Sequence, residues 1–162
     1  MKIRNLIVLV FFAITFSLQA QDYKSAIGLR LGSPLSLSFK TFISEKAAIE
    51  IAAGYRSYSY YNWFNIGGYY QHHMPINSVD GLAWYFGGGV NAYFWSFDDV
   101  YYPNNDFSSS SFGLSGCLGL DYKFADYPIN LSADWIPTFF INGFGDGFGA
   151  GYGALAVRYV FK

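Results

Sequence analysis

Eight charged residues share one feature: each lies in a segment where apolar residues alternate with small or polar ones, on the less apolar side. They are Arg30, Lys40, Glu50, Arg56, Asp121, Lys123, Asp134 and Arg158. If these sides enclose a narrow interior, the cations and carboxylates must satisfy one another, because an unpaired buried charge is costly. We therefore predict an interior ion-pair network with a structural role. The alternative is a gated pore, or a site for an anionic ligand beside the five cations.

The histidines and glycines of the chain do not form a catalytic or cofactor motif. His72 and His73 are adjacent, so a strand points them to opposite faces, where they cannot easily share a metal. A barrel deacylase would need a serine two residues from a histidine, but Met74 stands two residues after His72. The glycines of 143–153 share one parity, whereas a dinucleotide fingerprint needs both. We predict no catalysis, no metal site and no cofactor.

The longest polar segment, 96–111, is the best candidate for contact with other molecules. Its three acids follow no EF-hand spacing and are interpreted as solvated loop residues: Asp98, Asp99 and Asp106. Its aromatic residues are possible contacts for a partner or a polysaccharide: Phe97, Tyr101, Tyr102 and Phe107. The same aromatic residues would alternatively extend an aromatic girdle.

These candidates depend on segments that alternate with a period of two, which is typical of β-strands. Turn residues separate eight such segments. The predicted strands are 25–31, 35–42, 47–57, 63–74, 82–95, 112–124, 129–140 and a last strand ending at Phe161. Pro137 fits inside its strand only at a bulge, because proline cannot donate to a ladder. The predicted fold is an all-β, eight-stranded antiparallel up-and-down transmembrane β-barrel.

The N-terminus carries a basic start, an apolar core of eleven residues and a small-residue end at Ala20. This pattern predicts a secretory signal peptide over 1–20 and a barrel domain over 21–162. Removal of residues 1–20 leaves eight Lys and Arg against eleven Asp and Glu, a net charge of −3. Nothing in this balance favours nucleic acid as a partner. The single cysteine, Cys117, excludes an internal disulfide.

Alternation alone leaves two orientations open. A soluble, lipocalin-like barrel for an apolar ligand would turn its apolar face inward. The polar face, however, carries about one charge per strand and is otherwise mostly Gly, Ala and Ser, which is fewer charges than a soluble surface carries. Eight strands enclose a lumen that side chains just fill. We therefore expect the apolar face to contact lipid, with both termini in the periplasm and 96–111 outside.

The chain resembles the small eight-stranded outer-membrane β-barrels of the OmpA transmembrane-domain and OmpX type. The residues that carry this resemblance are the signal peptide ending in Ala20-Gln21, the eight alternating segments and the final Leu155-x-Val157-x-Tyr159-x-Phe161. In that family the last pattern is an assembly signal, which here implies Tyr159 and Phe161. Lys162 follows the aromatic residue, whereas the commonest form of the signal ends on it.

The resemblance implies a non-enzymatic protein of the bacterial outer membrane, exported through a cleaved signal peptide. We expect an occluded lumen and a structural role, or an interaction or adhesion role of the external loops. The expected partners are outer-membrane lipid, lipopolysaccharide and the barrel-assembly machinery, and we expect a monomer. A lipid-modifying barrel enzyme is the alternative within this class.

The glycine-rich start of the last strand has two possible arrangements. Uninterrupted parity from Leu155 would put Gly149, Gly151 and Gly153 on lipid, and Phe148 and Tyr152 in the lumen. Exposed glycines leave a strand poorly packed. We therefore predict either aromatic side chains of a neighbouring strand over these glycines, or a bulge near 149–153 that reverses the face.

Overall fold

A computed structural model describes residues 23–59, 61–97, 110–142 and 147–161, without the side chains of residues 97 and 150–152. It contains eight strands: β1 (Ser25–Gly32), β2 (Leu35–Phe42), β3 (Ala47–Ser57), β4 (Tyr61–Pro75), β5 (Leu82–Phe97), β6 (Ser110–Lys123), β7 (Ile129–Phe140) and β8 (Gly147–Phe161). The strand ends predicted from the sequence differ from these by at most two residues. The predicted all-β, eight-stranded antiparallel barrel is confirmed.

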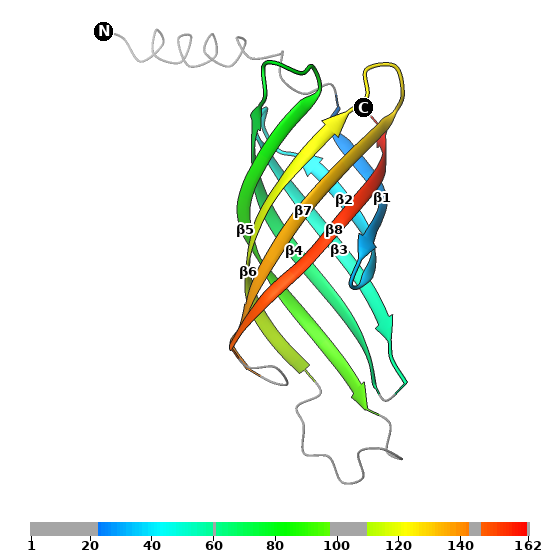
Figure 1. Ribbon diagram of the computed structural model, residues 1–162, viewed down its shortest axis with the longest axis vertical. Helices are drawn as coiled ribbons and strands as arrows, with labels where there is room; N and C mark the ends of the chain where they lie inside the picture. The colour runs from blue at the N-terminus through cyan, green and yellow to red at the C-terminus, as the bar shows by residue number, and fades with distance from the viewer. Residues whose placement is uncertain (1–22, 60, 98–109, 143–146, 162) are drawn as a thin grey trace, which may run out of the picture.

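Each strand pairs with the next along the chain, and β8 pairs with β1 to close the barrel (Figure 1). The closing pair runs from Ser25 opposite Phe161 to Gly32 opposite Ala154. Register partners followed from Arg30 through β2, β3, β4 and β5 reach Ser111 of β6, whereas partners followed the other way, through β8 and β7, reach Asp121 of β6. This stagger of ten residues gives strands tilted by roughly 35–45° and an interior that side chains fill.

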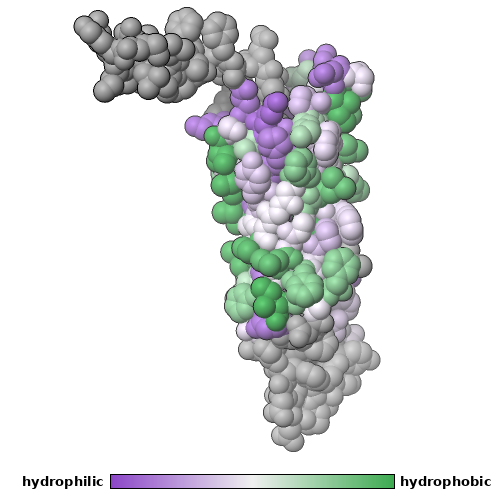
Figure 2. All heavy atoms as spheres, turned by 90° about the vertical axis from the view of Figure 1, so that its left-hand side faces the viewer, coloured by the Kyte–Doolittle hydropathy of each residue, from purple (hydrophilic) through white to green (hydrophobic). Residues whose placement is uncertain are grey.

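The apolar side chains of the strands point outward, which excludes the inward-facing arrangement of a lipocalin-like barrel. Leu118 and Trp135, for example, are register partners on β6 and β7, and their exposed fractions are 50% and 48%. Figure 2 shows hydrophobic and neutral residues over one side of the barrel, with hydrophilic ones mainly toward the end where β8 finishes. Among the described residues, no helix is long and apolar enough to cross a membrane.

Strand β8 carries a bulge opposite Pro137. Ile136 pairs with residue 152 and Thr138 with Gly149, so two residues of β8 stand opposite the single proline. Proline has no N–H to offer the ladder, and a bulge is one of the few places where a strand tolerates it. The predicted bulge near 149–153 is therefore confirmed.

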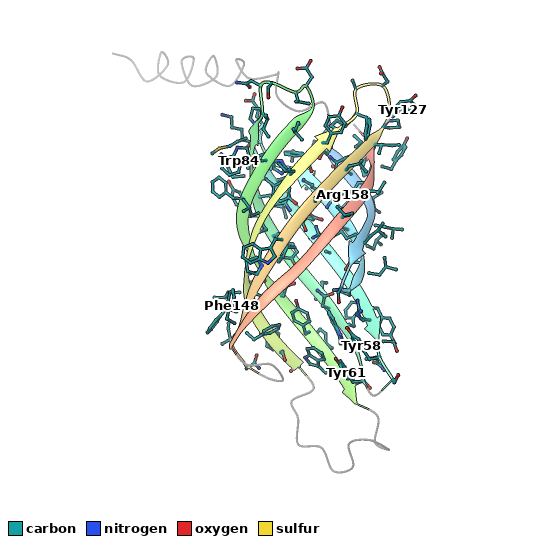
Figure 3. The ribbon with its side chains drawn as sticks, viewed as in Figure 1. Tyr58, Tyr61, Trp84, Tyr127, Phe148 and Arg158 are labelled. Atoms are coloured by element: carbon teal, nitrogen blue, oxygen red, sulfur yellow. The ribbon has the colours of Figure 1, made fainter. Side chains whose placement is uncertain are left out.

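The bulge reverses the faces of the strand beyond it. Phe148 points outward and is 69% exposed (Figure 3), whereas uninterrupted parity would have placed it in the lumen. Gly149 faces inward, where an added Cβ would lie 3.1 Å from the Phe140 ring. Gly153 remains on the outer side, opposite the exposed Trp135. The predicted positions of the side chains of residues 151 and 152 lie outside the described residues.

Two adjacent glycines of β5 test which face of the strand points into the barrel. A Cβ on the inward-facing Gly87 would overlap the Tyr70 carbonyl oxygen, whereas a Cβ on the outward-facing Gly88 would meet only Ser115 O, at 3.2 Å. Gly87→Ala is expected to lower the free energy of unfolding by about 1–3 kcal/mol, as overpacking does. Gly88→Ala, the matched control, is expected to change it by less than about 0.5 kcal/mol. Urea unfolding in lipid vesicles measures both; equal losses would contradict the assigned faces.

Candidate functional site

Six charged side chains, each from a different strand, meet inside the barrel. They are Arg30 of β1, Lys40 of β2, Glu50 of β3, Asp121 of β6, Asp134 of β7 and Arg158 of β8, and each is at most 9% exposed. Strand alternation turns each one inward. The cluster lies in the half of the barrel nearer the end where β8 finishes, as the position of Arg158 shows (Figure 3). We call these six residues the lumen cluster.

Glu50 is the centre of the lumen cluster. Its Oε1 accepts hydrogen bonds from Arg30 Nη1 at 2.9 Å and from Arg158 Nη2 at 2.6 Å, and its Oε2 accepts one from Gln71 Nε2 at 2.7 Å. Arg30 also donates from Nη2 to Asp134 Oδ1 at 2.6 Å. Glu50 thus pairs with two guanidinium groups, and a second carboxylate, Asp134, also pairs with one of them. Such charge-assisted bonds are stronger than neutral ones.

A second part of the lumen cluster surrounds Asp121. Lys40 Nζ lies 2.7 Å from Asp121 Oδ1, and Asn130 Nδ2 donates to Asp121 Oδ2 at 2.8 Å. Arg158 Nη1 donates to Asn130 Oδ1 at 3.3 Å, which joins this part to Glu50. Lys40 also stands over the Tyr85 ring, 4.8 Å from its centroid. The six charges therefore form one connected network rather than separate pairs.

Tyr23, just before β1, closes the network at the end where β1 begins. Its hydroxyl donates to Asp121 Oδ2 at 3.3 Å, and its ring meets Phe42 edge-on at 5.1 Å between centroids. Burial, together with the neighbouring Asp121 carboxylate, raises the pKa of the Tyr23 hydroxyl well above its usual value. The hydroxyl therefore stays protonated and remains a donor to Asp121.

Charge balance decides what the lumen cluster can do. Three cations face three carboxylates, and every one of these six groups has a partner of opposite sign within 2.9 Å. An incoming anion would have to displace a buried carboxylate from its cations, which costs several kcal/mol. The arrangement favours a structural plug over a site for an anionic ligand.

Apolar layers cover the lumen cluster on both sides. Toward the ends where β1 begins and β8 finishes, the buried layer consists of Tyr23, Ala26, Phe42, Ala48 and Val160. Toward the opposite end lie Trp63, Tyr93 and Phe140, with Tyr61 and Trp95 packed against them. Ring centroids in this aromatic layer are 5.2–5.5 Å apart for the pairs Tyr93–Phe140, Trp63–Tyr93 and Trp63–Trp95. The described part of the lumen is therefore filled in layers, apart from a small cavity beside Asn65.

Arg56 and Lys123 do not join the lumen cluster, although the sequence analysis grouped them with it. Arg56 lies near the end of β3, where its guanidinium stands over the Tyr58 ring, 4.8 Å from the centroid. Lys123 ends β6, and its ammonium donates to the carbonyl oxygens of Phe124 and Tyr127. Both residues have the expected parity, but they stand at strand ends and reach local partners instead.

The other candidate residues lie on the outer face, at buried positions outside the lumen cluster, or beyond the described part. Tyr159 and Phe161 point outward, with exposed fractions of 59% and 39%. Cys117 is buried with a free thiol, which donates to the Tyr70 carbonyl oxygen. His73 is buried between Phe42 and Tyr85, whereas His72 packs against Phe86. The side chains of Phe97, Tyr101, Tyr102 and Phe107, and the acids Asp98, Asp99 and Asp106, lie outside the described residues.

Several neutral partners of the network went unnoticed in the sequence. Gln71, Tyr85 and Asn130 donate to Glu50, Asp134 and Asp121 respectively. Their parity on the inward face was the available signal, since polar residues there must find partners. Among the described residues, no three His, Cys, Asp or Glu side chains are placed to hold a metal ion.

Comparisons with known proteins place this geometry in context. No protein-family model matches the chain, and no curated protein sequence matches it. Among solved structures, the N-terminal β-barrel domain of Pseudomonas aeruginosa OprF is similar, with a TM-score of 0.62 and 17% identity over 87% of this chain and 100% of that one. The chain has the fold of a small eight-stranded outer-membrane barrel.

A second structure agrees. Neisserial surface protein A (NspA) gives a TM-score of 0.54 and 16% identity, over 85% of this chain and 94% of that one. The resemblance inferred from the alternating segments is confirmed. At these identities the similarity concerns the fold, so function has to be argued from this chain's own residues.

Proposed function

We propose that this protein is a non-enzymatic integral barrel of the bacterial outer membrane with an occluded lumen. Its role is structural, or is carried by its external loops in binding or adhesion. The observation that carries the proposal is the inverted polarity of the barrel. Leu118 and other large apolar side chains point outward, while the charged lumen cluster is buried inside the barrel. A soluble protein would hide the first and solvate the second.

Aromatic residues support the membrane location further. Outward-facing Phe64 and Phe94 stack at 6.4 Å toward one end of the barrel, and Trp84 and Phe86 stack at 5.5 Å toward the other. Two aromatic girdles around an apolar band are typical of outer-membrane barrels. Outer-membrane lipid and lipopolysaccharide are then the partners of the outer surface. Tyr159 and Phe161, on the same surface, would serve as the signal for the barrel-assembly machinery, and export would use the signal peptide over 1–20.

Fractionation of the cell envelope tests this proposal. We expect the protein in the outer-membrane fraction, with a gel mobility that changes on heating because the closed barrel resists detergent. Recovery of the protein from the soluble fraction, with a gel mobility that does not change on heating, would overturn the membrane location. Mass spectrometry of lipid A, with and without expression of the gene, tests the non-enzymatic part. An altered acyl pattern that depends on the protein would show a lipid-modifying enzyme instead.

Planar bilayers test occlusion of the lumen. We expect no stable channels from the wild-type protein, because buried ion pairs and aromatic layers fill the described lumen. Truncation of the central pair, in Arg30→Ala with Glu50→Ala, is expected to raise the frequency of openings. Arg56→Ala, outside the lumen cluster, serves as the control and is expected to remain silent. Frequent, long-lived channels from the wild type would contradict occlusion.

A further inference from the structure

The β1–β2 hairpin is shorter than the strands on either side of it, so the barrel wall ends earlier there. β1 follows β8 only as far as the pair Gly32–Ala154, and β2 follows β3 only as far as Leu35–Tyr55. β8 extends seven residues beyond that pair, to Gly147. Figure 1 shows the hairpin ending well short of the neighbouring strand tips. The wall therefore has a gap beyond the β1–β2 turn, between β8 and β3, which we call the notch.

A small cavity lies behind this notch. The turn residues Ser33 and Pro34 form one side, Gly153 and Ala154 of β8 form another, and Asn65 of β4 lies deeper in the lumen. The cavity offers about 30 Å³ to water, which is room for about two molecules. It therefore admits the end of a polar group, and not a whole sugar ring.

One polar atom of the cavity wall has no partner among the described residues. Asn65 is 6% exposed, and its buried Oδ1 accepts no hydrogen bond. Gly54, its register partner on β3, lies close to this oxygen, and an added Cβ there would stand only 2.7 Å from it. A buried acceptor without a donor is unfavourable, and nearly all such groups in proteins are satisfied. A donor that enters the cavity would satisfy this oxygen.

The charge of the wall selects the kind of donor. Arg30 lines the same cavity, although Glu50 and Asp134 balance its charge. An ammonium group would meet a like charge at close range, which disfavours it. A hydroxyl group donates to Asn65 and offers its lone pairs to the guanidinium. The cavity therefore suits a neutral hydroxyl group.

Apolar residues surround the mouth on the outside. The register partners Leu31 and Leu155 flank it on one side, with exposed fractions of 52% and 61%. The partners Leu35 and Tyr55 flank it on the other, with 55% and 56%. We propose that the notch binds a membrane amphiphile with a neutral, hydroxyl-bearing head: the hydroxyl enters the cavity and bonds Asn65, and the alkyl chain lies along these outer residues. This inference rests on the proposed membrane location.

Three neutral probes test the proposal on the folded protein in dimethyldodecylamine-oxide micelles. Monoolein has two hydroxyl groups and an oleoyl chain, methyl oleate has the chain without a donor, and glycerol has hydroxyl groups without the chain. We expect only monoolein to produce a saturable NMR shift of the Asn65 side-chain amide at near-stoichiometric amounts. An equal shift with methyl oleate would show that the chain alone binds, and equal affinity for glycerol would show a soluble polyol site; each result would overturn the proposal.

Two matched variants locate the binding. Asn65→Leu removes the acceptor, and we expect monoolein binding, counted by native mass spectrometry, to weaken at least fivefold. Asn62→Leu makes the same change three residues away, at a position that does not line the cavity, and is expected to bind normally. Asn65→Leu is expected to fold at least as well as the wild type, because it buries no unpaired acceptor. Unchanged monoolein binding by Asn65→Leu would refute the assignment.

Heat-dependent gel mobility of the same samples separates the two proposals. A protein without this mobility change would contradict the proposed membrane barrel itself. A protein that shows the change but retains no monoolein would contradict only the site in the notch.

Discussion

Replacing Glu50 with glutamine is expected to lower the free energy of unfolding by about 3–5 kcal/mol, the usual cost of leaving buried charges without their counter-ion. Glutamine keeps the size and one acceptor oxygen but removes the charge that Arg30 and Arg158 share through Oε1. Three buried cations would then face only Asp121 and Asp134. Urea unfolding in lipid vesicles measures the loss as a lower transition midpoint.

Two further variants distinguish charge imbalance from a general effect of mutation. Asp80→Asn makes the same kind of change at an exposed turn residue and is expected to cost less than about 0.5 kcal/mol. Combining Glu50→Gln with Arg158→Met restores the charge balance, so we expect it to recover part of the loss, as neutral replacements of buried ion pairs do. Full additivity of the two single substitutions would contradict a shared network.

The sequence predicted faces well because face depends only on parity within a strand. Glu50 and Arg56 share a parity, as do Asp121 and Lys123, and all four were expected inside. Only Glu50 and Asp121 enter the lumen cluster. The four residues differ in their position along the barrel axis. That position depends on the register of every strand pair and on the stagger of ten residues around the barrel. Register is a property of distant pairings, which alternation in one segment does not encode.

Other parts of the site escaped prediction for different reasons. Tyr23 precedes the first alternating segment, so no period indicated that its ring would enter the lumen and reach Asp121. Asn65 has the parity of the lumen face, but the cavity beside it exists only because β1 and β2 end early. In β8, the alternation of inward and outward residues reverses at the bulge opposite Pro137, so parity counted from Leu155 gives the wrong face beyond it. The proline itself was the sequence signal, since a strand interior accepts it at a bulge.

Replacing Leu118 with arginine is expected to cost about 2–4 kcal/mol of unfolding free energy. Leu118 lies well inside β6, so the charge would stand on the apolar outer face, away from the ends of the strand. Leu118 is 50% exposed and lies between Phe86 and Trp135 of the neighbouring strands. A soluble barrel with the same structure would show almost no loss, since arginine on a wet surface is well tolerated. The substitution therefore measures what surrounds this face.

Ile43→Arg provides the depth control for that measurement. Ile43 is 59% exposed, slightly more than Leu118, but it stands in the β2–β3 turn at the end of the barrel. An arginine there reaches the interface and is expected to cost about 0–1 kcal/mol. Unfolding in lipid vesicles by urea compares the two variants directly. The two residues are similarly exposed, so the Leu118 variant can be much less stable only if the surroundings are less polar at Leu118 than at Ile43. Equal losses would contradict a membrane around the outer face.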